Sequence, residues 1–518
     1  MGARTTRVVG GAAAGTASLA AFFGASELTA LATGPNSQPA VAFGEVVIAH
    51  TPEWLKNFAI SHFGEDDKLA LAIGVYVAFT VLAAAVGALA GPGRAWLAVG
   101  AIAVLGAVTG LSAVAQPSAS GSQALPSAVG ALAGAVVFVA LTRRQSGAVD
   151  GVQGASSGGA EAKAVPRRQV LAGAGSFLAL GAAAYLLGRE ALAKAYSAAV
   201  SRAAVKLPRP SSATAEVPGT SFDIEGLAPY VTPNRDFYRV DTALVVPQLP
   251  TDGYSLAVHG MVERAAIFTY DDLLSMPLIE RAITMVCVSD PVGGPYVGNA
   301  RWLGVPLVHL LGLVGPRPGA DQLFMTSSDG MTIGADLAAA MDGRPAMLAL
   351  GMNGEPLPFK HGFPVRAIIP GLYGYASACK WLVDIEVTTY AAKQAYWVRR
   401  GYSRDGTIKL ESKIDTPTSF AQVKAGTVTV AGSAWHPTVG IRKVELSVDG
   451  GPWQAASLAA VESVDTWRLW RWDWQATPGS HTLAVRATDN NGHVQTATSA
   501  PVVPNGTSGR QSVVVTVT

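Results

Sequence analysis

The stretch TMVCVSDPVGGPYVGNARWLGVPL, residues 284–307, carries the most informative pattern in the chain. An apolar run ends at Cys287, and the glycine pair Gly293-Gly294 follows a few residues later. This order predicts a thiol at a strand-to-loop transition, beside backbone that a bulky ligand can approach closely. Taken alone, however, the pattern favours a buried and unreactive cysteine.

A second segment, NGEPLPFKHGFPVRAIIPGLYGYASACKWL at 353–382, combines cationic side chains with Pro- and Gly-rich turns. His361, Arg366 and Lys380 form a positive set of hydrogen-bonding groups. Such a set suits a cofactor that bears phosphate, because guanidinium and ammonium groups make charge-assisted hydrogen bonds to phosphate oxygens. Without the cysteine segment, an ordinary basic turn explains these residues equally well.

The residues around these two segments predict two further domains. From 221 to 400, short β-rich runs alternate with Pro- and Gly-rich loops and short helices, which is typical of a mixed α+β domain. Within it, residues 269–276 predict a short helix capped by Thr269, and residues 346–358 predict a strand pair that turns at Asn353-Gly354. From 405 to 518 the pattern becomes all-β, with alternating apolar residues and turn dipeptides such as Asp449-Gly450, and it predicts a small β-sandwich. A Pro- and Ser-rich linker at 207–220 precedes both domains.

Residues 1–190 predict a transmembrane helical bundle of about five spans. The segment LALAIGVYVAFTVLAAAVGALA at 69–90 contains no charged residue and is long enough to cross a hydrocarbon layer of about 30 Å. A Gly-, Ser- and Ala-rich connector at 145–166 precedes the last span. The five predicted spans are 8–32, 69–90, 95–115, 124–142 and 170–187.

Charged residues beside the spans predict which side the later domains occupy. Cytoplasmic loops carry an excess of Lys and Arg, and most flanking cations in this chain occupy alternate loops. They place the N-terminus in the cytoplasm and the chain beyond 190 outside the cytoplasmic membrane. These cations are Arg4, Arg7, Arg94, Arg143, Arg144, Lys163, Arg167 and Arg168. Four others favour the opposite orientation, namely Arg189, Lys194, Arg202 and Lys206.

Composition excludes several classes of protein and of site. The 38 basic and 36 acidic residues nearly balance at a net charge of +2, which argues against a nucleic-acid binder. With only two cysteines, disulfide scaffolds, four-cysteine zinc sites and four-cysteine iron–sulfur clusters are excluded. The spans contain no histidine, which argues against a bis-histidine haem, and no conspicuous charge pair, which argues against a transporter.

Together, CVSDPVGG…GNARWLGVPL and NGEPLP…HGFPVR…PGLYGYASACKWL resemble the molybdopterin-dependent oxidoreductases of the sulfite oxidase family, and the resemblance covers 225–518. It implies a sulfite-oxidase-like molybdopterin domain at 221–400, with molybdenum–molybdopterin as the cofactor. It also implies an Ig-like domain of the dimerisation type at 405–518, and therefore a homodimer. No segment resembles the fused haem domain of animal sulfite oxidase, so no haem is expected.

The resemblance also assigns roles to single residues by position. Cys287 takes the place of the thiolate ligand to molybdenum, and Tyr402 in YWVRRGYS (396–403) maps to the tyrosine that hydrogen-bonds the substrate. An upstream motif, TPNRDFYRVDTAL at 232–244, adds three cofactor contacts, and FMTSSDG adds Thr326, with Asp329 as its alternative. The implied cofactor-binding residues are Arg235, Tyr238, Arg239, Thr326, His361, Arg366, Ser377 and Lys380.

Two departures from the family pattern concern the substrate. Sulfite oxidases have an arginine and then a histidine just after the FY of the upstream motif, whereas this chain has Val240-Asp241-Thr242 there. That stretch is closer to the bacterial periplasmic methionine-sulfoxide-reductase branch. Asp290 and Pro291 also replace the more usual residues after the cysteine. The substrate therefore stays open between a small oxyanion such as sulfite and a sulfoxide.

The resemblance implies an enzyme that transfers an oxygen atom to or from a small substrate and exchanges electrons with a separate electron-transfer partner. The flanking cations place this activity outside the cytoplasmic membrane. Because the family receives its cofactor in the cytoplasm, such a domain crosses the membrane already folded, and PRRQVLAGAGSFLALGAAA at 166–184 resembles a retained twin-arginine export signal. One alternative is a metal-free, membrane-tethered binding protein that uses its β-sandwich. The other is a transporter with an appended outer domain.

Overall fold

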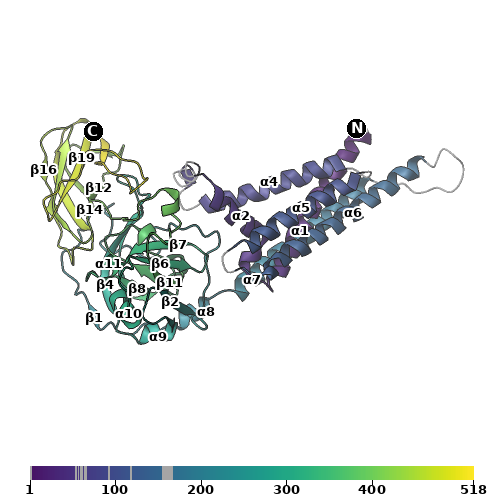
Figure 1. Ribbon diagram of the computed structural model, residues 1–518. Helices are drawn as coiled ribbons and strands as arrows, with labels where there is room; N and C mark the ends of the chain where they lie inside the picture. Colours follow the sequence, from purple (N-terminus) through teal and green to yellow (C-terminus); the bar gives the residue numbers. More distant parts are fainter. Residues whose placement is uncertain are drawn as a thin grey trace. The chain divides into compact units, whose positions relative to one another are not determined.

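The computed structural model describes residues 3–52, 55, 58, 62, 63, 67–90, 94–116, 119–153 and 167–518. The chain divides into two compact units. A helical unit comprises Met1–Ser197 together with Asp241–Val246, and a β-rich unit comprises Ala198–Val240 together with Pro247–Thr518. Figure 1 shows the long helices of the first unit and the sheets of the second.

Long apolar helices make up the helical unit. Within the described residues, five helices are long and apolar enough to cross a membrane, and each overlaps one of the five predicted spans. Their apolar stretches are Val8–Ala30, Lys68–Ala90, Ala95–Val114, Gly121–Arg143 and Leu171–Ala204. The helices themselves are α1 (Ala3–Ala30), α2 (Pro39–His50), α4 (Asp67–Ala90), α5 (Ala95–Val114), α6 (Leu125–Gln153) and α7 (Arg167–Ala195).

Helix α1 packs against α4, α6 and α7, and small residues allow the close approach. A Cβ atom on Gly11 would lie only 2.3 Å from the backbone oxygen of Gly87 in α4. The Ser26 hydroxyl donates a hydrogen bond of 2.9 Å to the backbone oxygen of Pro126 in α6. Small residues and polar side chains at helix contacts are typical of helices that associate without water between them.

Three details of the helical unit differ from the sequence-based expectation or extend it. Helix α2 was not predicted, because its apolar stretch is too short to span a membrane. Helix α6 continues to Gln153 and so includes the first part of the predicted connector at 145–166. Lys163 and the rest of that connector, from 154, lie outside the described residues.

A six-stranded sheet and a five-stranded sheet form the first part of the β-rich unit, which we call the cofactor-type part. One sheet has the order β1-β4-β5-β8-β10, with β9 on β8, and the other has the order β3-β2-β11-β6-β7. Short helices α8 (Ala199–Ala204), α9 (Tyr270–Ser275), α10 (Leu307–Val314) and α11 (Leu337–Met341) accompany them. The strands are β1 (Ser212–Ala213), β2 (Ser255–Gly260), β3 (Ala266–Thr269), β4 (Ile279–Val286), β5 (Val297–Pro306), β6 (Gln322–Ser327), β7 (Thr332–Asp336), β8 (Met347–Met352), β9 (Glu355–Pro356), β10 (Arg366–Ile368) and β11 (Leu382–Thr388).

Several local predictions for this part are confirmed. Helix α9 begins at the N-cap Thr269, whose hydroxyl accepts a hydrogen bond from the backbone of Asp272, as the sequence predicts. Strands β8 and β9 turn at Asn353-Gly354, both with positive φ, which matches the predicted hairpin. Part of the predicted linker at 207–220 forms strand β1, which pairs with β4 and so belongs to the sheet.

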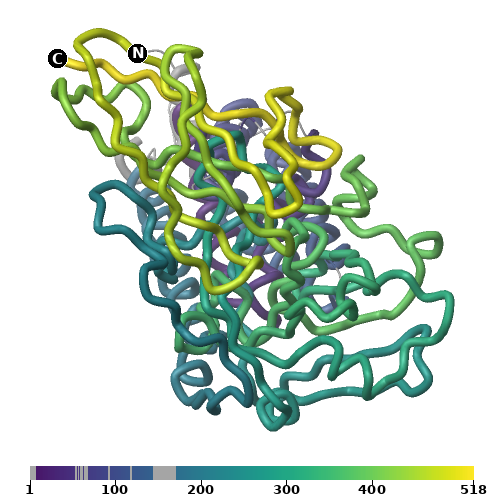
Figure 2. The backbone as a smooth tube through the Cα atoms, turned by 90° about the vertical axis from the view of Figure 1, so that its left-hand side faces the viewer, coloured from purple at the N-terminus to yellow at the C-terminus, as the bar shows by residue number. Residues whose placement is uncertain are grey.

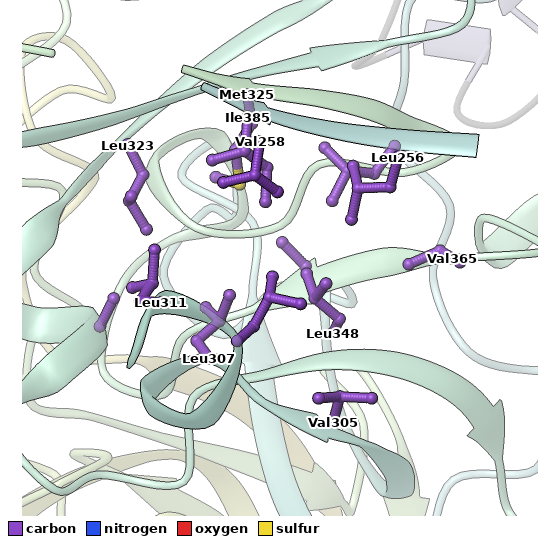
Figure 3. Packing of buried hydrophobic residues seen from close by; sticks show 14 of the residues in the cluster. Leu256, Val258, Val305, Leu307, Leu311, Leu323, Met325, Leu348, Val365 and Ile385 are labelled. Carbon is purple, nitrogen blue, oxygen red and sulfur yellow. The ribbon is translucent and has the colours of Figure 1, made fainter. Parts of the chain in front are cut away.

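The main core of this part lies between the two sheets. In Figure 3, side chains from β2, β6 and β11 face side chains from β5, β8 and α10. Both sets are fully buried, so the two sheets hold each other through apolar contact. The labelled residues are Leu256, Val258, Val305, Leu307, Leu311, Leu323, Met325, Leu348, Val365 and Ile385.

The C-terminal strands form the predicted β-sandwich. A four-stranded sheet has the order β12-β14-β18-β17, and a five-stranded sheet has the order β13-β20-β19-β15-β16. Strands β19 and β20, yellow in Figure 2, run side by side as an antiparallel pair. The strands are β12 (Glu411–Thr416), β13 (Gln422–Val423), β14 (Gly426–Trp435), β15 (Ile441–Val448), β16 (Gln454–Ala455), β17 (Ser457–Leu458), β18 (Arg468–Ala476), β19 (Gly479–Asp489) and β20 (Ser512–Val517).

Candidate cofactor site

Cys287 lies where the sequence places it, at the first position after strand β4 and at the start of a tight loop. The backbone N–H of Cys287 donates to the oxygen of Tyr296 at 2.9 Å, and its oxygen accepts from the N–H of Asp290 at 3.0 Å. The Asp290 carboxylate accepts a further hydrogen bond of 2.7 Å from the N–H of Tyr296. The aspartate that departs from the family pattern therefore closes this loop.

The Cys287 thiol is only partly accessible, because its residue is 8% exposed. Burial raises the pKa of Cys287 to about 11, although a hydrogen bond from the N–H of Ser289, at 3.4 Å from Sγ, lowers it. The thiol is thus neutral near pH 7 unless a cation binds there. A metal ion provides that cation, since it deprotonates a coordinating thiol outright.

Arg366, in strand β10, is a buried cation whose residue is only 5% exposed. Its Nη1 donates to the backbone oxygen of His361 at 3.1 Å, and its Nη2 lies 3.7 Å from the sulfur of Met285, two residues before the cysteine. Its guanidinium also lies 5.0 Å from the centre of the Trp302 ring. Burial lowers the pKa of Arg366 to about 10, so the group remains charged at neutral pH.

No anion in the described part of the chain pairs with Arg366, and its Nε has no hydrogen-bond partner there. A buried and unpaired charge is costly in free energy, and most buried charges have a partner. An anionic ligand would therefore complete the arrangement that the described residues form. A phosphate group meets that need, because guanidinium binds it with two parallel hydrogen bonds.

His361 lies in the turn that leads to Arg366, and it is also buried. Its Nε2 lies 3.0 Å from the backbone oxygen of Asn234 in the upstream motif. Burial first, and then the nearby Arg366 charge, lower the pKa of His361 to about 4, so the ring is neutral at pH 7. Gly362 follows with φ of 108°, and a Cβ there would lie 3.1 Å from the Cβ atoms of Arg366 and Lys380. This glycine brings the three predicted cofactor contacts together.

Lys380 and Ser377 occupy the loop that precedes strand β11. The Lys380 ammonium donates to the backbone oxygen of Lys360 at 3.2 Å and lies 4.7 Å from the centre of the Trp381 ring. The buried Ser377 hydroxyl lies 3.0 Å from the backbone oxygens of Leu372 and Tyr373 and donates within its own turn. Ser377 thus stabilises the loop, while its oxygen keeps lone pairs that can accept a hydrogen bond.

Tyr238 and Arg239, from the upstream motif, also belong to this site. The Tyr238 ring stacks on Phe237 with a separation of 5.2 Å between ring centres. Burial raises the pKa of Tyr238, and the neighbouring Cys287 raises it further. The charge of Arg239 contributes to the lowered pKa of His361. The structure therefore brings this part of the motif to the two segments that carry the cysteine and the cations.

Arg235 and Thr326 are placed differently. The Arg235 side chain is 86% exposed and forms an ion pair with Asp236 at 3.3 Å, so it faces solvent. Thr326 is half-buried in strand β6, where it pairs with Asp384 of β11 and Thr332 of β7. Neither residue contacts Arg366 or His361 through a hydrogen bond among the described residues.

Two serines next to Thr326 were not predicted. The hydroxyls of Ser327 and Ser328 are buried and have no hydrogen-bond partner within the described ranges. The N–H of Ser328 donates to the backbone oxygen of Trp381 at 2.9 Å, which ties this turn to the residue after Lys380. Unsatisfied hydroxyls beside a cationic loop are further groups that a polar ligand would satisfy. The only sequence signal for these two serines was their position between Thr326 and Asp329, the two candidate polar contacts.

Tyr402 is buried in an aromatic cluster. Its ring lies 5.2 Å from that of Trp397 and 5.4 Å from that of Tyr375, measured between ring centres. The same cluster contains Val286 and Val288, the residues on either side of the cysteine. Tyr402 therefore packs in the cluster that supports the cysteine loop.

Comparison with known proteins agrees with this geometry. A family described as "Oxidoreductase molybdopterin binding domain" matches residues 243–397, and one described as "Bacterial Ig domain" matches residues 411–485. An uncharacterised oxidoreductase, YuiH, from Bacillus subtilis is 30% identical over 153 residues, which cover 30% of this chain and 74% of that protein. The chain belongs to the molybdopterin-dependent oxidoreductases of the sulfite oxidase family.

Other similar proteins match a longer part of this chain. The mitochondrial sulfite oxidases of Mus musculus and Homo sapiens are each 30% identical over 322 residues, covering 53% of this chain. The chain spans 58% of the length of these two relatives. Among solved structures, the sulfane dehydrogenase SoxCD from Paracoccus pantotrophus has 23% identity and a TM-score of 0.48, covering 57% of this chain and 85% of that one.

The described residues fit the cofactor of this family. They contain no cluster of three or more His, Cys, Asp or Glu side chains that could hold a metal ion alone. The buried thiol of Cys287, the guanidinium of Arg366 and the two serine hydroxyls beside Thr326 instead suit a ligand that brings its own metal ligands and its own anionic group. Molybdopterin has both, because its dithiolene binds the metal and its phosphate is the anionic group.

Proposed function

We propose that this protein is a membrane-anchored molybdenum-cofactor oxidoreductase that transfers an oxygen atom to or from a small substrate outside the cytoplasmic membrane. The observation that carries the proposal is the buried Arg366, which has no anionic partner among the described residues and lies beside the strand that leads to Cys287. A structural arginine in a core normally has a carboxylate or several carbonyl partners. Among the described residues, the Arg366 guanidinium has only one carbonyl oxygen and one sulfur as partners, so it can still bind an anionic ligand.

Each residue of the site has a part in this proposal. The Cys287 sulfur binds the metal as a thiolate, while His361, Arg366 and Lys380 hold and orient the anionic part of the cofactor. When bound, the cofactor supplies oxygen-atom exchange with a two-electron change at the metal. The chain supplies the orientation, and the surrounding apolar residues limit the access of water.

The proposed substrate is a small oxyanion or a sulfoxide. Arg239 provides a positive charge near the cofactor site that can attract an anion, and Tyr402 is the candidate hydrogen-bond donor on the substrate side. Val240 and the two residues after it, in place of the arginine and histidine of sulfite oxidases, favour a sulfoxide. A separate electron-transfer partner takes or returns the electrons one at a time.

The proposed location rests on the helical unit. Five helices with the length and composition of membrane spans support a multi-pass anchor. The cations in alternate loops favour a β-rich unit outside the cytoplasmic membrane. Fusing alkaline phosphatase, which is active only outside, after residue 518 would test this orientation directly.

Elemental analysis of the detergent-purified full chain tests the function. We expect close to one molybdenum per chain in the wild type and in the control Cys379→Ala, because Cys379 is buried in the apolar core. We expect the molybdenum that Cys287→Ser still binds to have one sulfur ligand fewer by X-ray absorption spectroscopy, since a hydroxyl is a poor ligand for a soft metal site. The loaded protein is then assayed with sulfite and an artificial electron acceptor, and with sulfoxides and an artificial electron donor.

Two results would contradict the proposal. An unchanged number of sulfur ligands around molybdenum in Cys287→Ser would show that the ligand is assigned to the wrong residue. A wild-type protein without molybdenum, from a host that makes the cofactor, would favour a metal-free binding protein that uses its β-sandwich.

A further inference from the structure

One segment of the β-sandwich contacts the tip of the cysteine loop. The segment at 507–511, just before strand β20, begins with Thr507, whose hydroxyl donates a hydrogen bond of 2.7 Å to the backbone oxygen of Asp290. The same Asp290 closes the loop through its contacts with Cys287 and Tyr296. A side chain of the sandwich thus holds the residue that gives the cysteine loop its shape.

Gln511, at the other end of this segment, covers the turn at the tip. The turn runs from Pro291 to Gly294, whose N–H donates to the oxygen of Pro291 at 2.7 Å. Gly293 has φ of 76°, and a Cβ there would lie 2.4 Å from the Gln511 side chain. The Gln511 amide accepts from the N–H of Ile414 and donates to the oxygen of the same residue, so strand β12 fixes it.

The sandwich also holds the strand that leads into the loop. The N–H of Thr284 in β4 donates to the backbone oxygen of Asp465 at 2.9 Å, and its hydroxyl accepts from the N–H of Trp467 at 2.7 Å. Thr284 and Trp467 are both buried. Cys287 therefore lies between two points of the chain, Thr284 and Asp290, that are both bound by the β-sandwich.

We propose that the β-sandwich positions the Cys287 sulfur, and that Thr507 and Gln511 are the positioning residues. Their contacts keep the loop closed, and the closed loop points the N–H of Ser289 at Sγ. The role of this positioning in catalysis rests on the proposed function, in which Cys287 binds the metal. The positioning itself is a property of the chain and is testable without any metal.

The test uses the metal-free full chain from a host that lacks the cofactor. Iodoacetamide alkylates Cys287 in native protein, and mass spectrometry of the Cys287 peptide gives the rate. We expect Thr507→Val to raise that rate roughly threefold to tenfold, the factor for one lost hydrogen bond that holds the loop closed. Thr507→Ser, which keeps the hydroxyl, should restore the wild-type rate.

The control is Thr427→Val, the same change in strand β14, where the hydroxyl bonds to Gln475 on β18. It should leave the alkylation rate unchanged, even if it lowers the melting temperature as much as Thr507→Val does. Gln511→Met gives a second measurement, should Thr507→Val fail to fold, and it too should raise the rate.

Equal alkylation rates in the wild type and in either folded variant would overturn the proposal, because the contacts would then stabilise the fold without positioning the thiol. A faster rate in chains that bind no molybdenum from any host would keep this inference and reject the proposed function.

Discussion

At the scale of single residues, Arg366 offers a test of whether this region is a cofactor site or a structural core. Its guanidinium is buried beside Met285 and Trp302, and no carboxylate in the described chain pairs with it. Arg301 offers a contrast in the same sheet, because its guanidinium pairs with Glu462, whose side chain is only 2% exposed. Removing the charge of these two arginines should therefore change the stability of the metal-free protein differently.

We expect Arg366→Met to leave the metal-free protein as stable as the wild type or more stable by about 1 kcal/mol, because it removes an unpaired buried charge. The same variant should lose the bound cofactor. Arg301→Met should lower the free energy of unfolding by about 3 kcal/mol, since it leaves the Glu462 carboxylate buried without its cation. Thermal unfolding of the two metal-free variants measures the change in stability. Molybdenum analysis of the same variants, produced in a host that makes the cofactor, measures the bound cofactor. A large loss of stability in metal-free Arg366→Met would show that the arginine is structural.

At the scale of elements, strand β5 positions the upstream motif through a glycine. A Cβ on Gly298 would lie 2.8 Å from the Phe237 ring. Phe237 in turn stacks on Tyr238 and meets the His361 ring edge-on, with 5.5 Å between ring centres. The absence of a side chain at Gly298 therefore allows this aromatic residue to reach the cofactor site.

We expect Gly298→Ala to displace Phe237 and to destabilise the protein by about 1–3 kcal/mol, the usual cost of overpacking a core. Molybdenum content should fall with it, because Tyr238 and His361 lose their packing partner. The matched control is Gly312→Ala in helix α10, where an added Cβ meets nothing within 4 Å. That change should be neutral or stabilising by about 0.5–1 kcal/mol, as expected inside a helix. Equal melting temperatures for the two variants would contradict the role of Gly298.

At the scale of the whole molecule, the β-sandwich and the cofactor-type part share a core. One cluster joins Trp435, Trp467 and Leu469 of the sandwich to Val286 and Val288 of the cysteine segment. Side chains in such a cluster lose their burial when either part is absent, and an exposed apolar patch of that kind promotes aggregation. The two parts match separate families, yet they pack as one structural unit.

We therefore expect a chain that ends at residue 404 to aggregate or to unfold without cooperativity, rather than to form a stable cofactor domain. Size-exclusion chromatography in detergent and thermal unfolding would show this. The full chain under the same conditions should remain monodisperse. A truncated chain that is monodisperse, unfolds cooperatively and binds molybdenum would contradict the shared core.

Much of this protein was predictable from the sequence, because the decisive signals are local. Runs of apolar residues predicted all five long helices, and alternation with turn dipeptides predicted the β-sandwich and the hairpin at Asn353. The position of Cys287 after a strand also followed from the chain alone. Short helix α2 was missed, since its length lies below that of a membrane span.

The family resemblance identified the residues near the site but not their orientation. It grouped Arg235 with Tyr238 and Arg239, yet only the tertiary structure shows that Arg235 faces solvent. The unsatisfied hydroxyls of Ser327 and Ser328 likewise have no signature in the sequence. Whether a side chain is buried, and whether it has a partner, depends on residues far away along the chain.

The sequence by itself thus determined the helical unit, the two kinds of sheet domain and the position of Cys287 after a strand, because periodicity and turn chemistry act over a few residues. Only the tertiary structure decided that Arg366 has no anionic partner in the described part of the chain and that Thr507 bonds to the loop of Cys287. Both facts arise from contacts between segments far apart in the chain, which no local pattern records.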